Sequence, residues 1–432
     1  MKIAIIGGGI TGITLAWLLS GLGKIVVYEK NSRLATGHSS LDASLDSSTA
    51  DASPASPANT IDKIDRGIPL FFPYYQTELA SLFEYLDIYT EPRPLSYRSY
   101  GKFPFKMGAM PAAGLSFRKL APITNNRISN DVQLMYRSLL QDYNQKNVPI
   151  NLTLRQYIRG LKIHDNSIHE AIYPVIASLW NYSPDAMKDF SASEYMKFIN
   201  RSKLLDHKVS DQVRYLPESM DKYLSKLLFK GSFEYLLNTP VAKVKYSNSM
   251  VNITDANKAR KSFDRVIITC SPEDAREIID PEIATWQDTL SKLEGHDFPV
   301  FIHRDAALLK EFGDSVMGSS ITYTLNTRNV AYHYNLGIIN KLPKDSPHYP
   351  LMMSINLPNK PSNIIHESRT YRPGLDVVTT RYYREISAAQ GNAGVYYCTD
   401  GLNPGTSPMT GGINAAISFA KELGVELPFS TQ

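Results

Sequence analysis

The 432-residue sequence contains only two cysteines, Cys270 and Cys398, and each follows a short apolar run. Two cysteines exclude a disulfide scaffold and predict a reducing compartment, the cytoplasm. The nine histidines are dispersed, and no clustered His/Cys spacing of the kind that binds metals occurs. The sequence therefore predicts no metal site. His164 and His169, which flank an acidic stretch, are interpreted as solvated surface residues.

The sequence also has little excess charge and few long uncharged runs. A net charge of +4 with scattered basic residues gives no indication of nucleic-acid binding. Residues 4–23 are almost uncharged and could form a signal sequence or a membrane span, but six glycines in this window argue against both. No transmembrane segment is predicted, and peripheral membrane contact stays open. The length allows two domains with substantial cores.

The opening stretch, MKIAIIGGGITGITLAWLLSGLGKIVVYEK, predicts a strand, a glycine turn, a helix and a second strand that ends in Glu29. Gly7 permits the turn, Gly9 lets the backbone approach a diphosphate, and Gly12 lets the helix pack closely on its strand. The diphosphate would bind the unpaired N–H groups of the helix, and Glu29 could accept both ribose hydroxyls of an adenosine. The alternative is a glycine-rich turn that binds no nucleotide.

Residues 31–60 predict a loop between ordered segments. Arg33 and His38 follow the second strand and could approach a phosphate, although a solvated loop arginine is an equal alternative. Residues 39–60 consist almost wholly of Ser, Ala, Asp, Pro and Thr, which predicts a flexible surface loop. Order resumes at 61–72, where an apolar strand flanks Gly67.

The middle of the chain predicts helices and then strands. Apolar spacing predicts amphipathic helices over 77–88, 131–144, 153–161, most of 165–204, and 217–230. Residues 239–246 and 250–254 alternate across a polar turn and predict a hairpin. Five runs within 297–390, the last of them VVTTRYYR at 377–384, predict an antiparallel sheet of about five strands. Trp180 is interpreted as a core residue rather than a ligand platform.

Two later segments resemble parts of a central sheet. FDRVIITCSPEDAREII is an apolar strand followed by a helix, with Ser271 as the N-cap and Pro272 at the first helical position. Near the C-terminus, GVYYCTD is a strand that ends in Asp400, and a glycine-rich loop then leads into another helix. These features predict a second part of the nucleotide site. A strand and helix that only complete the sheet are the alternative.

The motifs IIGGGITG, TPVAKV, VYYCTDG and MTGGINAA resemble FAD-binding elements of the flavin amine oxidase and protoporphyrinogen oxidase-like superfamily. Segments such as IDRGIPLFFPYYQTELASLFEYLDI look similar to a bacterial branch of predicted NAD/FAD-binding proteins. The resemblance implies an α/β fold, with a Rossmann-like domain of the glutathione-reductase type that binds FAD. An inserted α+β substrate domain would contain the antiparallel sheet. The implied FAD-binding domain comprises 1–75, 205–290 and 391–432, and the substrate-binding domain comprises 76–204 and 291–390.

The resemblance also implies roles for individual residues. Glu29 would hold the adenosine ribose, Val241 the adenine, and Asp400 would approach the diphosphate and ribityl chain. Backbone at Gly67 would face the isoalloxazine ring. The complete implied cofactor set is Gly7, Gly9, Ile10, Thr11, Gly12, Glu29, Lys30, Arg33, His38, Gly67, Ile68, Val241, Cys270, Asp400, Met409, Thr410 and Gly411.

The sequence departs from the family pattern at three places. The usual double glycine after Arg33 and Leu34 is replaced by Ala35-Thr36-Gly37. Cys398 and Thr399 precede Asp400 where a small residue and a glycine are expected. Met409 and Thr410 replace acidic and histidine residues of the bacterial branch. These departures put identity of substrate with that branch in question.

The resemblance implies an FAD-dependent oxidoreductase that removes a hydride from a C–H bond of a mainly apolar small molecule. The reaction would be a desaturation, a dehydrogenation or an amine oxidation. A flavin-dependent isomerase or mutase without net redox change is one alternative, and a non-catalytic FAD-binding partner protein is another. No motif isolates a catalytic base. Tyrosine pairs such as Tyr396-Tyr397 could each send one ring into a pocket, but core packing is the preferred interpretation.

Overall fold

A computed structural model describes most of the chain. The described residues are 1–37, 40–42, 63–66, 70–92, 96–99, 105–110, 114–115, 126–145, 148–149, 151–180, 182–203, 206, 213–217, 219–283, 285–308, 319–324, 329–340, 342, 345, 349–402 and 407–429. The predictions for His38, Gly67 and Ile68, and for most of the loop 39–60, lie outside these residues. Part of that loop prediction is wrong, because Ser40–Asp42 forms strand β3, which pairs with β4 (Lys63–Asp65).

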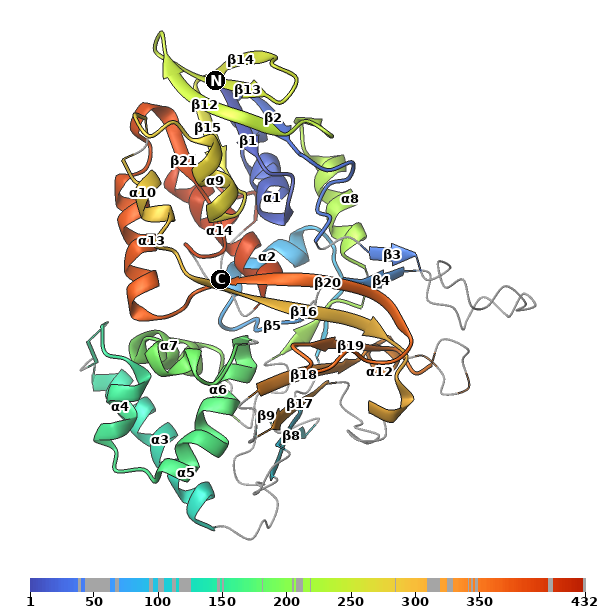
Figure 1. The fold of residues 1–432 in the computed structure, drawn as a ribbon, viewed down its shortest axis with the longest axis vertical. Coiled ribbons are helices and arrows are strands. Elements are labelled where there is room, and N and C mark those ends of the chain that lie inside the picture. Colours follow the sequence, from blue (N-terminus) through green and yellow to red (C-terminus); the bar gives the residue numbers. More distant parts are fainter. Residues whose placement is uncertain are drawn as a thin grey trace.

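A five-stranded parallel sheet forms the centre of the upper half of the molecule (Figure 1). Its strands, in spatial order, are β11 (Glu234–Leu236), β2 (Lys24–Tyr28), β1 (Lys2–Ile6), β15 (Arg265–Ile268) and β21 (Val395–Tyr397). Their apolar runs are typical of parallel strands that are covered on both faces. The sheet therefore joins both ends of the chain with its middle, as the sequence predicted.

Helices cover one face of this sheet. They are α1 (Ile10–Leu18), α2 (Thr77–Tyr85), α8 (Met220–Lys230) and α14 (Pro408–Glu422). Alternate strand residues such as Ile3, Ile5 and Val27 are at most 1% exposed in the core beneath these helices. The first helix and the last helix of the chain therefore pack on the same face of the same sheet.

The other face is covered by an antiparallel meander and by two helices. The meander consists of β12 (Val241–Ser247), β13 (Met250–Asp255) and β14 (Arg260–Phe263). Helices α9 (Pro272–Ile278) and α13 (Val377–Ala389) complete this layer. The predicted hairpin is confirmed by the pairing of β12 with β13. The predicted cap is also confirmed, since the Ser271 hydroxyl accepts the Asp274 N–H at 3.2 Å.

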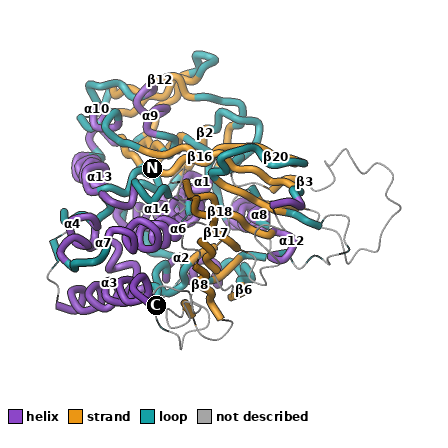
Figure 2. The backbone as a smooth tube through the Cα atoms, turned by 60° about the horizontal axis from the view of Figure 1, so that its bottom comes forward, coloured by secondary structure: helices purple, strands orange, loops and turns teal. Residues whose placement is uncertain are grey.

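A group of helices lies beside the strands (Figure 2). These are α3 (Asn126–Gln145), α4 (Leu154–Gly160), α5 (Asp165–Ser167), the π-helix η5 (Ile168–Ile172), α6 (Tyr173–Trp180), the 3-10 helix η6 (Ala186–Asp189) and α7 (Ala192–Arg201). They share one apolar core, which contains Trp180 at 3% exposure. The helices predicted over 131–144, 153–161 and 165–204 are therefore confirmed.

A second five-stranded sheet is antiparallel, in the order β17 (Ser319–Thr324), β18 (Asn329–Asn335), β19 (Met352–Ile355), β16 (Gly295–His303) and β20 (Ile364–Pro373). The predicted sheet is confirmed, but one strand was assigned to the wrong segment. Residues 377–384 form part of helix α13, because the Asp376 carboxylate accepts the N–H groups of Val378 and Thr379, both at 2.9 Å. The fifth strand is β20 instead.

Shorter elements complete the described chain. They are β5 (Leu70–Phe71), β6 (Glu91–Pro92), β7 (Ser96–Ser99), β8 (Phe105–Met110), β9 (Gly114–Leu115), β10 (Arg214–Tyr215), α10 (Gln287–Leu290) and α12 (Leu336–Ile339), with 3-10 turns η1 (Ser20–Leu22) and η7 (Asn392–Gly394). No helix in the described part of the chain combines the length and apolarity that a membrane crossing needs.

Candidate functional site

The glycine turn between β1 and α1 is closely packed. Gly7 has a φ of +113°, and a Cβ atom on Gly12 would lie 1.9 Å from the carbonyl oxygen of Gly7. The Thr269 hydroxyl donates to the carbonyl oxygens of Ile6 and Gly7, both at 3.0 Å. Gly7 is therefore required by backbone conformation, and Gly12 by the close contact of helix and turn.

Gly9 differs from these two glycines, because a Cβ atom on it would meet nothing within 4 Å. Gly9 is the N-cap residue of α1, and no side chain caps this helix. The first N–H groups of a helix have no partner within the helix, and the helix dipole favours an anion there. This open helix terminus has the form that a diphosphate requires.

Glu29 lies against the glycine turn. Its carboxylate accepts the N–H of Gly8 at 2.6 Å, and from Asn31 it accepts the backbone N–H at 2.8 Å and the side-chain amide at 2.6 Å. Only 6% of the residue is exposed. The end of β2 therefore holds a carboxylate next to Gly9, where the prediction places the adenosine ribose.

Lys30 and Arg33 lie near residues outside the glycine turn. Lys30 Nζ lies 2.9 Å from a carboxylate oxygen of Asp274, and this hydrogen bond raises the pKa of Lys30. Arg33 is exposed and lies near Arg66 and Asp221. Burial, followed by the charge of Arg33, lowers the pKa of Arg66. The cofactor roles of Lys30 and Arg33 stay predictions.

The loop after Glu29 has a left-handed backbone conformation at Ala35, a position that is not glycine. Ala35, at one of the departures from the family pattern, has a φ of +48° and is 1% exposed. Its N–H donates to the carbonyl oxygen of Gly8 at 2.7 Å. A left-handed conformation costs a non-glycine residue about 1 kcal/mol. The contact between loop and turn is thus kept despite the substitution.

The N-terminus of α14 meets the N-terminus of α1. A Cβ atom on Gly412 would lie 2.6 Å from Thr11 Oγ1 and 2.9 Å from Ile10 Cγ2. Ile10 and Thr11 are 4% and 8% exposed. The structure therefore brings together Gly9 to Gly12 and the start of the last helix, as the sequence predicted for the two parts of the site.

The first turn of α14 is fixed by its own cap. The Ser407 hydroxyl accepts the N–H of Thr410 at 3.3 Å, and Thr410 Oγ1 accepts the N–H of Ser407 at 3.1 Å. Met409 is 2% exposed and Gly411 is also buried. Thr410 thus has a structural role in this capping box. Contacts of 409–411 with a flavin remain predictions.

Val241 begins β12, and Cys270 lies two residues beyond the end of β15. The N–H of Thr239, two residues before Val241, donates to the carbonyl oxygen of Glu29 at 2.8 Å. Cys270 follows β15, and its carbonyl oxygen accepts the Tyr397 hydroxyl at 3.3 Å. Burial, followed by the charge of Asp274, raises the pKa of the Cys270 thiol to about 12. This thiol is therefore protonated at neutral pH.

Asp400 belongs to a buried polar cluster that sequence reasoning missed. Burial raises the pKa of Asp400 to about 6, although the charge of Arg372 acts in the opposite direction. Arg372, on β20, is 3% exposed and lies 5.6 Å from the ring centre of Tyr182. The Tyr182 and His296 rings are 5.3 Å apart, and burial lowers the pKa of His296. No sequence signal connects Arg372 with Asp400, because folding alone brings β20 to the end of β21.

Part of one face of the antiparallel sheet is apolar. We call it the apolar sheet face; it consists of Phe298, Val300, Ile302, Tyr332, Tyr334, Met353 and Ile355. It packs against Ile64 of β4 and Tyr215 of β10, and each of its members is at most 8% exposed. Strand β4 ends just before the segment predicted to face the isoalloxazine ring.

Among the described residues, no group of three or more His, Cys, Asp or Glu side chains could hold a metal ion. The residues that the structure does bring together fit FAD. An open helix terminus at Gly9 suits a diphosphate, and the Glu29 carboxylate suits a ribose.

Comparisons with solved structures agree with this fold. A protein from Exiguobacterium provisionally described as a protoporphyrinogen oxidase is 13% identical, with a TM-score of 0.67 and coverage of 99% of both chains. A fatty acid isomerase from P. acnes, described as producing CLA, is 13% identical, with a TM-score of 0.66 and coverage of 97% of this chain and 98% of that chain. Cyclohexylamine oxidase from Brevibacterium oxydans is 15% identical, with a TM-score of 0.62 and coverage of 98% and 99%.

Family models give a direct assignment. A model described as FAD dependent oxidoreductase matches residues 2–94, and one described as flavin containing amine oxidoreductase matches residues 62–296, more than half of the chain. None of the curated proteins matches the sequence. The chain thus belongs to the flavin containing amine oxidoreductase family and is an FAD-dependent oxidoreductase.

Proposed function

We propose that the protein removes a hydride from a C–H bond of a mainly apolar small molecule. FAD supplies the hydride acceptor when it is bound, and the protein supplies binding, orientation and electrostatics. The proposed FAD-binding domain comprises residues 1–75, 205–290 and 391–432. The proposed substrate-binding domain comprises 76–204 and 291–390, which include the helical group and the antiparallel sheet.

In this proposal the two ends of the chain hold the cofactor together. The N–H groups after Gly9 bind the diphosphate, and Glu29 accepts the ribose hydroxyls. The N-terminus of α14 lies next to that of α1, so its dipole favours negative charge at the flavin edge predicted near 409–411. Asp400 follows β21, at the carboxyl end of that strand of the same sheet.

The proposal of an apolar substrate rests on the apolar sheet face. Its members have only hydrocarbon, thioether or phenol side chains, which suit an apolar chain, and His296 and Arg372 lie on the same face of the sheet at its Tyr182 end. Tyr332 already donates its hydroxyl to the carbonyl oxygen of Tyr182 at 2.6 Å. We therefore assign to this face the orientation of an apolar chain and the exclusion of water rather than proton transfer.

A second candidate function is isomerisation of an unsaturated apolar chain without net redox change. The apolar sheet face would suit such a substrate equally well. The fold shared with the fatty acid isomerase, at a TM-score of 0.66, gives this candidate a precedent. An amine oxidation, as in the name of the cyclohexylamine oxidase, is the third possibility within the same site.

Anaerobic spectroscopy of the FAD-loaded protein distinguishes these reactions. Oxidised flavin absorbs near about 375 and 450 nm, and a dehydrogenase bleaches the second band when its substrate is added. We expect bleaching by fatty acids or other apolar compounds and none by polyamines. An isomerase would convert an unsaturated acid while its final spectrum stays oxidised. Bleaching by charged amines alone would contradict the proposed substrate class.

A matched pair of variants tests the apolar sheet face itself. Met353 belongs to this face, whereas Met352 precedes it on the same strand and points to the opposite face. Both are buried, at 0% and 2% exposure. Met353→Gln is expected to slow bleaching by an apolar substrate about tenfold, and Met352→Gln much less, at a similar cost in stability. Equal rates would contradict the assignment.

A further inference from the structure

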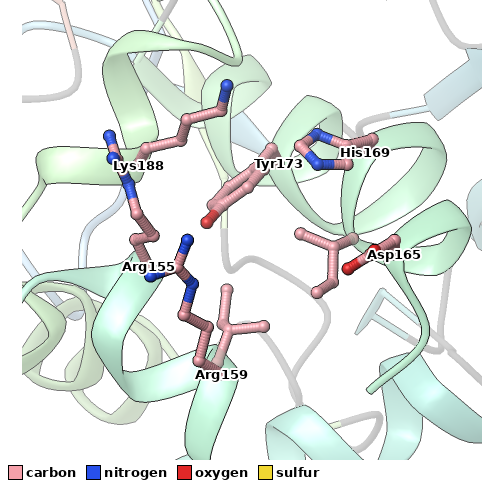
Figure 3. Close-up of a pocket in the computed structure, with 8 residues that line it drawn as sticks. Arg155, Arg159, Asp165, His169, Tyr173 and Lys188 are labelled. Atoms are coloured by element: carbon pink, nitrogen blue, oxygen red, sulfur yellow. The ribbon is translucent and has the colours of Figure 1, made fainter. Parts of the chain in front are cut away.

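A hollow in the helical group lies outside the FAD site (Figure 3). Its volume is about 210 Å³, and α4, α5, η5, α6 and η6 contribute its walls. Arg155, Arg159, Lys188 and Tyr173 supply hydrogen-bond donors, and Asp165 is the single acid in the lining. Ile158 and Ile168 add apolar surface. Asp185 and Asp189 pair with Lys188 and Arg155 beside the hollow, so its donors toward an anion are Arg159, the Tyr173 hydroxyl and the inner N–H of Arg155.

The cations of this hollow are held in position. Arg155 lies 2.9 Å from Asp189, and Lys188 pairs with Asp185. The Nε atom of Arg155 is buried and has no hydrogen-bond partner among the described residues. Since the outer end of Arg155 is fixed by Asp189, this inner N–H is oriented for another acceptor. Arg159 is exposed, and no ion pair involves it within the described part of the chain.

Tyr173 supplies a neutral donor on the same wall. It is 3% exposed, and burial raises its pKa to about 12, so the hydroxyl keeps its proton at neutral pH. The charges of Arg155 and Arg159 oppose this effect and lower the pKa of Tyr173. In Figure 3 the Tyr173 hydroxyl points toward the two arginines, whereas Asp165 lies on the opposite side of the hollow. The Tyr173 hydroxyl and Arg159 are therefore separated from Asp165, whereas Asp189 lies beside Arg155.

The backbone gives a second, independent indication. Ile168–Ile172 is a π-helix, which directly precedes Tyr173 and contributes Ile168 and His169 to the hollow. π-helical turns are rare and are found frequently at functional sites.

We propose that this hollow binds the phosphate group of a phosphate monoester. The Arg159 guanidinium, the inner N–H of Arg155 and the Tyr173 hydroxyl together match the several acceptor oxygens of such a group. The volume exceeds the roughly 30 Å³ that one water molecule occupies in the liquid, so the hollow also has room for the first atoms of the attached molecule. Ile158 and Ile168 would contact those atoms. The ester could come from a soluble metabolite or from a lipid headgroup.

Calorimetric titration of the FAD-loaded protein with inorganic phosphate and phenyl phosphate tests the soluble source. Sedimentation with phosphatidylcholine vesicles, with and without phosphatidic acid, tests the lipid source. Binding by either route supports the site if Arg159→Gln and Tyr173→Phe each weaken it by about tenfold. Arg260→Gln, which removes an exposed cation from the distant strand β14, is the matched control and should bind as the wild type does.

The two sources give different patterns. Saturable binding of phenyl phosphate identifies a soluble ester, and binding to phosphatidic acid vesicles alone identifies a lipid. Flavin absorbance of each variant verifies that it is folded. Absence of binding in both assays overturns the proposal. Equal binding by Arg159→Gln, Tyr173→Phe and Arg260→Gln overturns it as well.

Discussion

Gly412 in the last helix packs directly on Thr11 in the first, so that a Cβ atom on Gly412 would lie 2.6 Å from Thr11 Oγ1. We expect Gly412→Val to lower the free energy of unfolding by about 1 to 3 kcal/mol, because the new methyl groups have no space between the two helices. FAD affinity should fall as well, since the two helix termini would be pushed apart. Urea unfolding and FAD titration measure the two effects.

Gly160 provides the control for this change. It also lies in a helix, but a Cβ atom on it would meet nothing within 4 Å. Gly160→Val is therefore expected to change the free energy of unfolding by less than about 1 kcal/mol and to leave FAD affinity unchanged. Similar losses in both variants would contradict the importance of the contact between α1 and α14.

Glu29→Gln tests the predicted ribose contact. The substitution keeps the size of the side chain but removes the charge that accepts hydrogen bonds from Gly8 and Asn31. Hydrogen bonds to a charged group contribute about 1.5 to 3 kcal/mol, so FAD affinity should fall by about tenfold or more. Fluorescence titration of the apoprotein gives the dissociation constant. Glu234→Gln, at an exposed residue paired with Lys24, should have no effect. If Glu29→Gln bound FAD as tightly as the control, the assigned role would be wrong.

The parts of the fold that could be predicted are those with local signals. The glycine turn follows from Gly7 and Gly12, and helix α9 follows from Ser271 and Pro272, because these residues impose conformations by themselves. The C-terminal strand and helix were predicted to form a second part of the nucleotide site, but the contact of Gly412 with Thr11 was not predicted, because it depends on tertiary packing.

The errors have physical causes as well. The β-branched run Val377 to Thr380 suggested a strand, but the cap at Asp376 starts a helix there. Strand β20 was missed because it lies at the edge of its sheet, so it alternates polar residues with few apolar ones. The approach of Arg372 to Asp400 depends on tertiary packing and left no pattern in the sequence.

A buried pair of histidines predicts acid sensitivity. Ser354 Oγ lies 2.8 Å from His303 Nε2 and 2.8 Å from His333 Nδ1. Burial lowers the pKa of His303 to about 4 and that of His333 to about 3. The unfolded chain therefore binds protons below pH 6.5 that the folded chain does not, and stability falls as the pH falls. Each histidine contributes a slope of about 1 kcal/mol per pH unit below about pH 6.5.

Urea unfolding between pH 7.5 and 5 measures this slope in the wild type and in the His303→Gln/His333→Gln variant. The comparison is needed because Asp65 and Asp400 also titrate in this range. Their pKa values are raised to about 6 in the folded state. These two groups therefore favour the folded state as the pH falls, opposite to the effect of the histidines. The variant should lose stability less steeply with acid. Identical slopes would show that the two histidines do not titrate differently on unfolding.

Both cysteines should be unreactive in the folded protein. Burial raises the pKa of Cys270 to about 12 and the pKa of Cys398 further still, so neither thiol forms the reactive thiolate near neutral pH. Ellman's reagent at pH 8 is expected to modify neither thiol within minutes in the native state and both in urea. Rapid native labelling of Cys270→Ser would place a reactive thiol at Cys398 and contradict its burial.

The central claim is that the open terminus at Gly9 binds the diphosphate of FAD, and Gly9→Ala tests it most directly. A Cβ atom at Gly9 meets no protein atom within 4 Å, whereas one at Gly12 would lie 1.9 Å from Gly7. The measurement is FAD titration of Gly9→Ala apoprotein together with its thermal unfolding. We predict wild-type apoprotein stability with FAD affinity reduced by about tenfold or more, because the methyl group occupies the diphosphate's place. Wild-type FAD affinity in a folded Gly9→Ala protein would contradict the account.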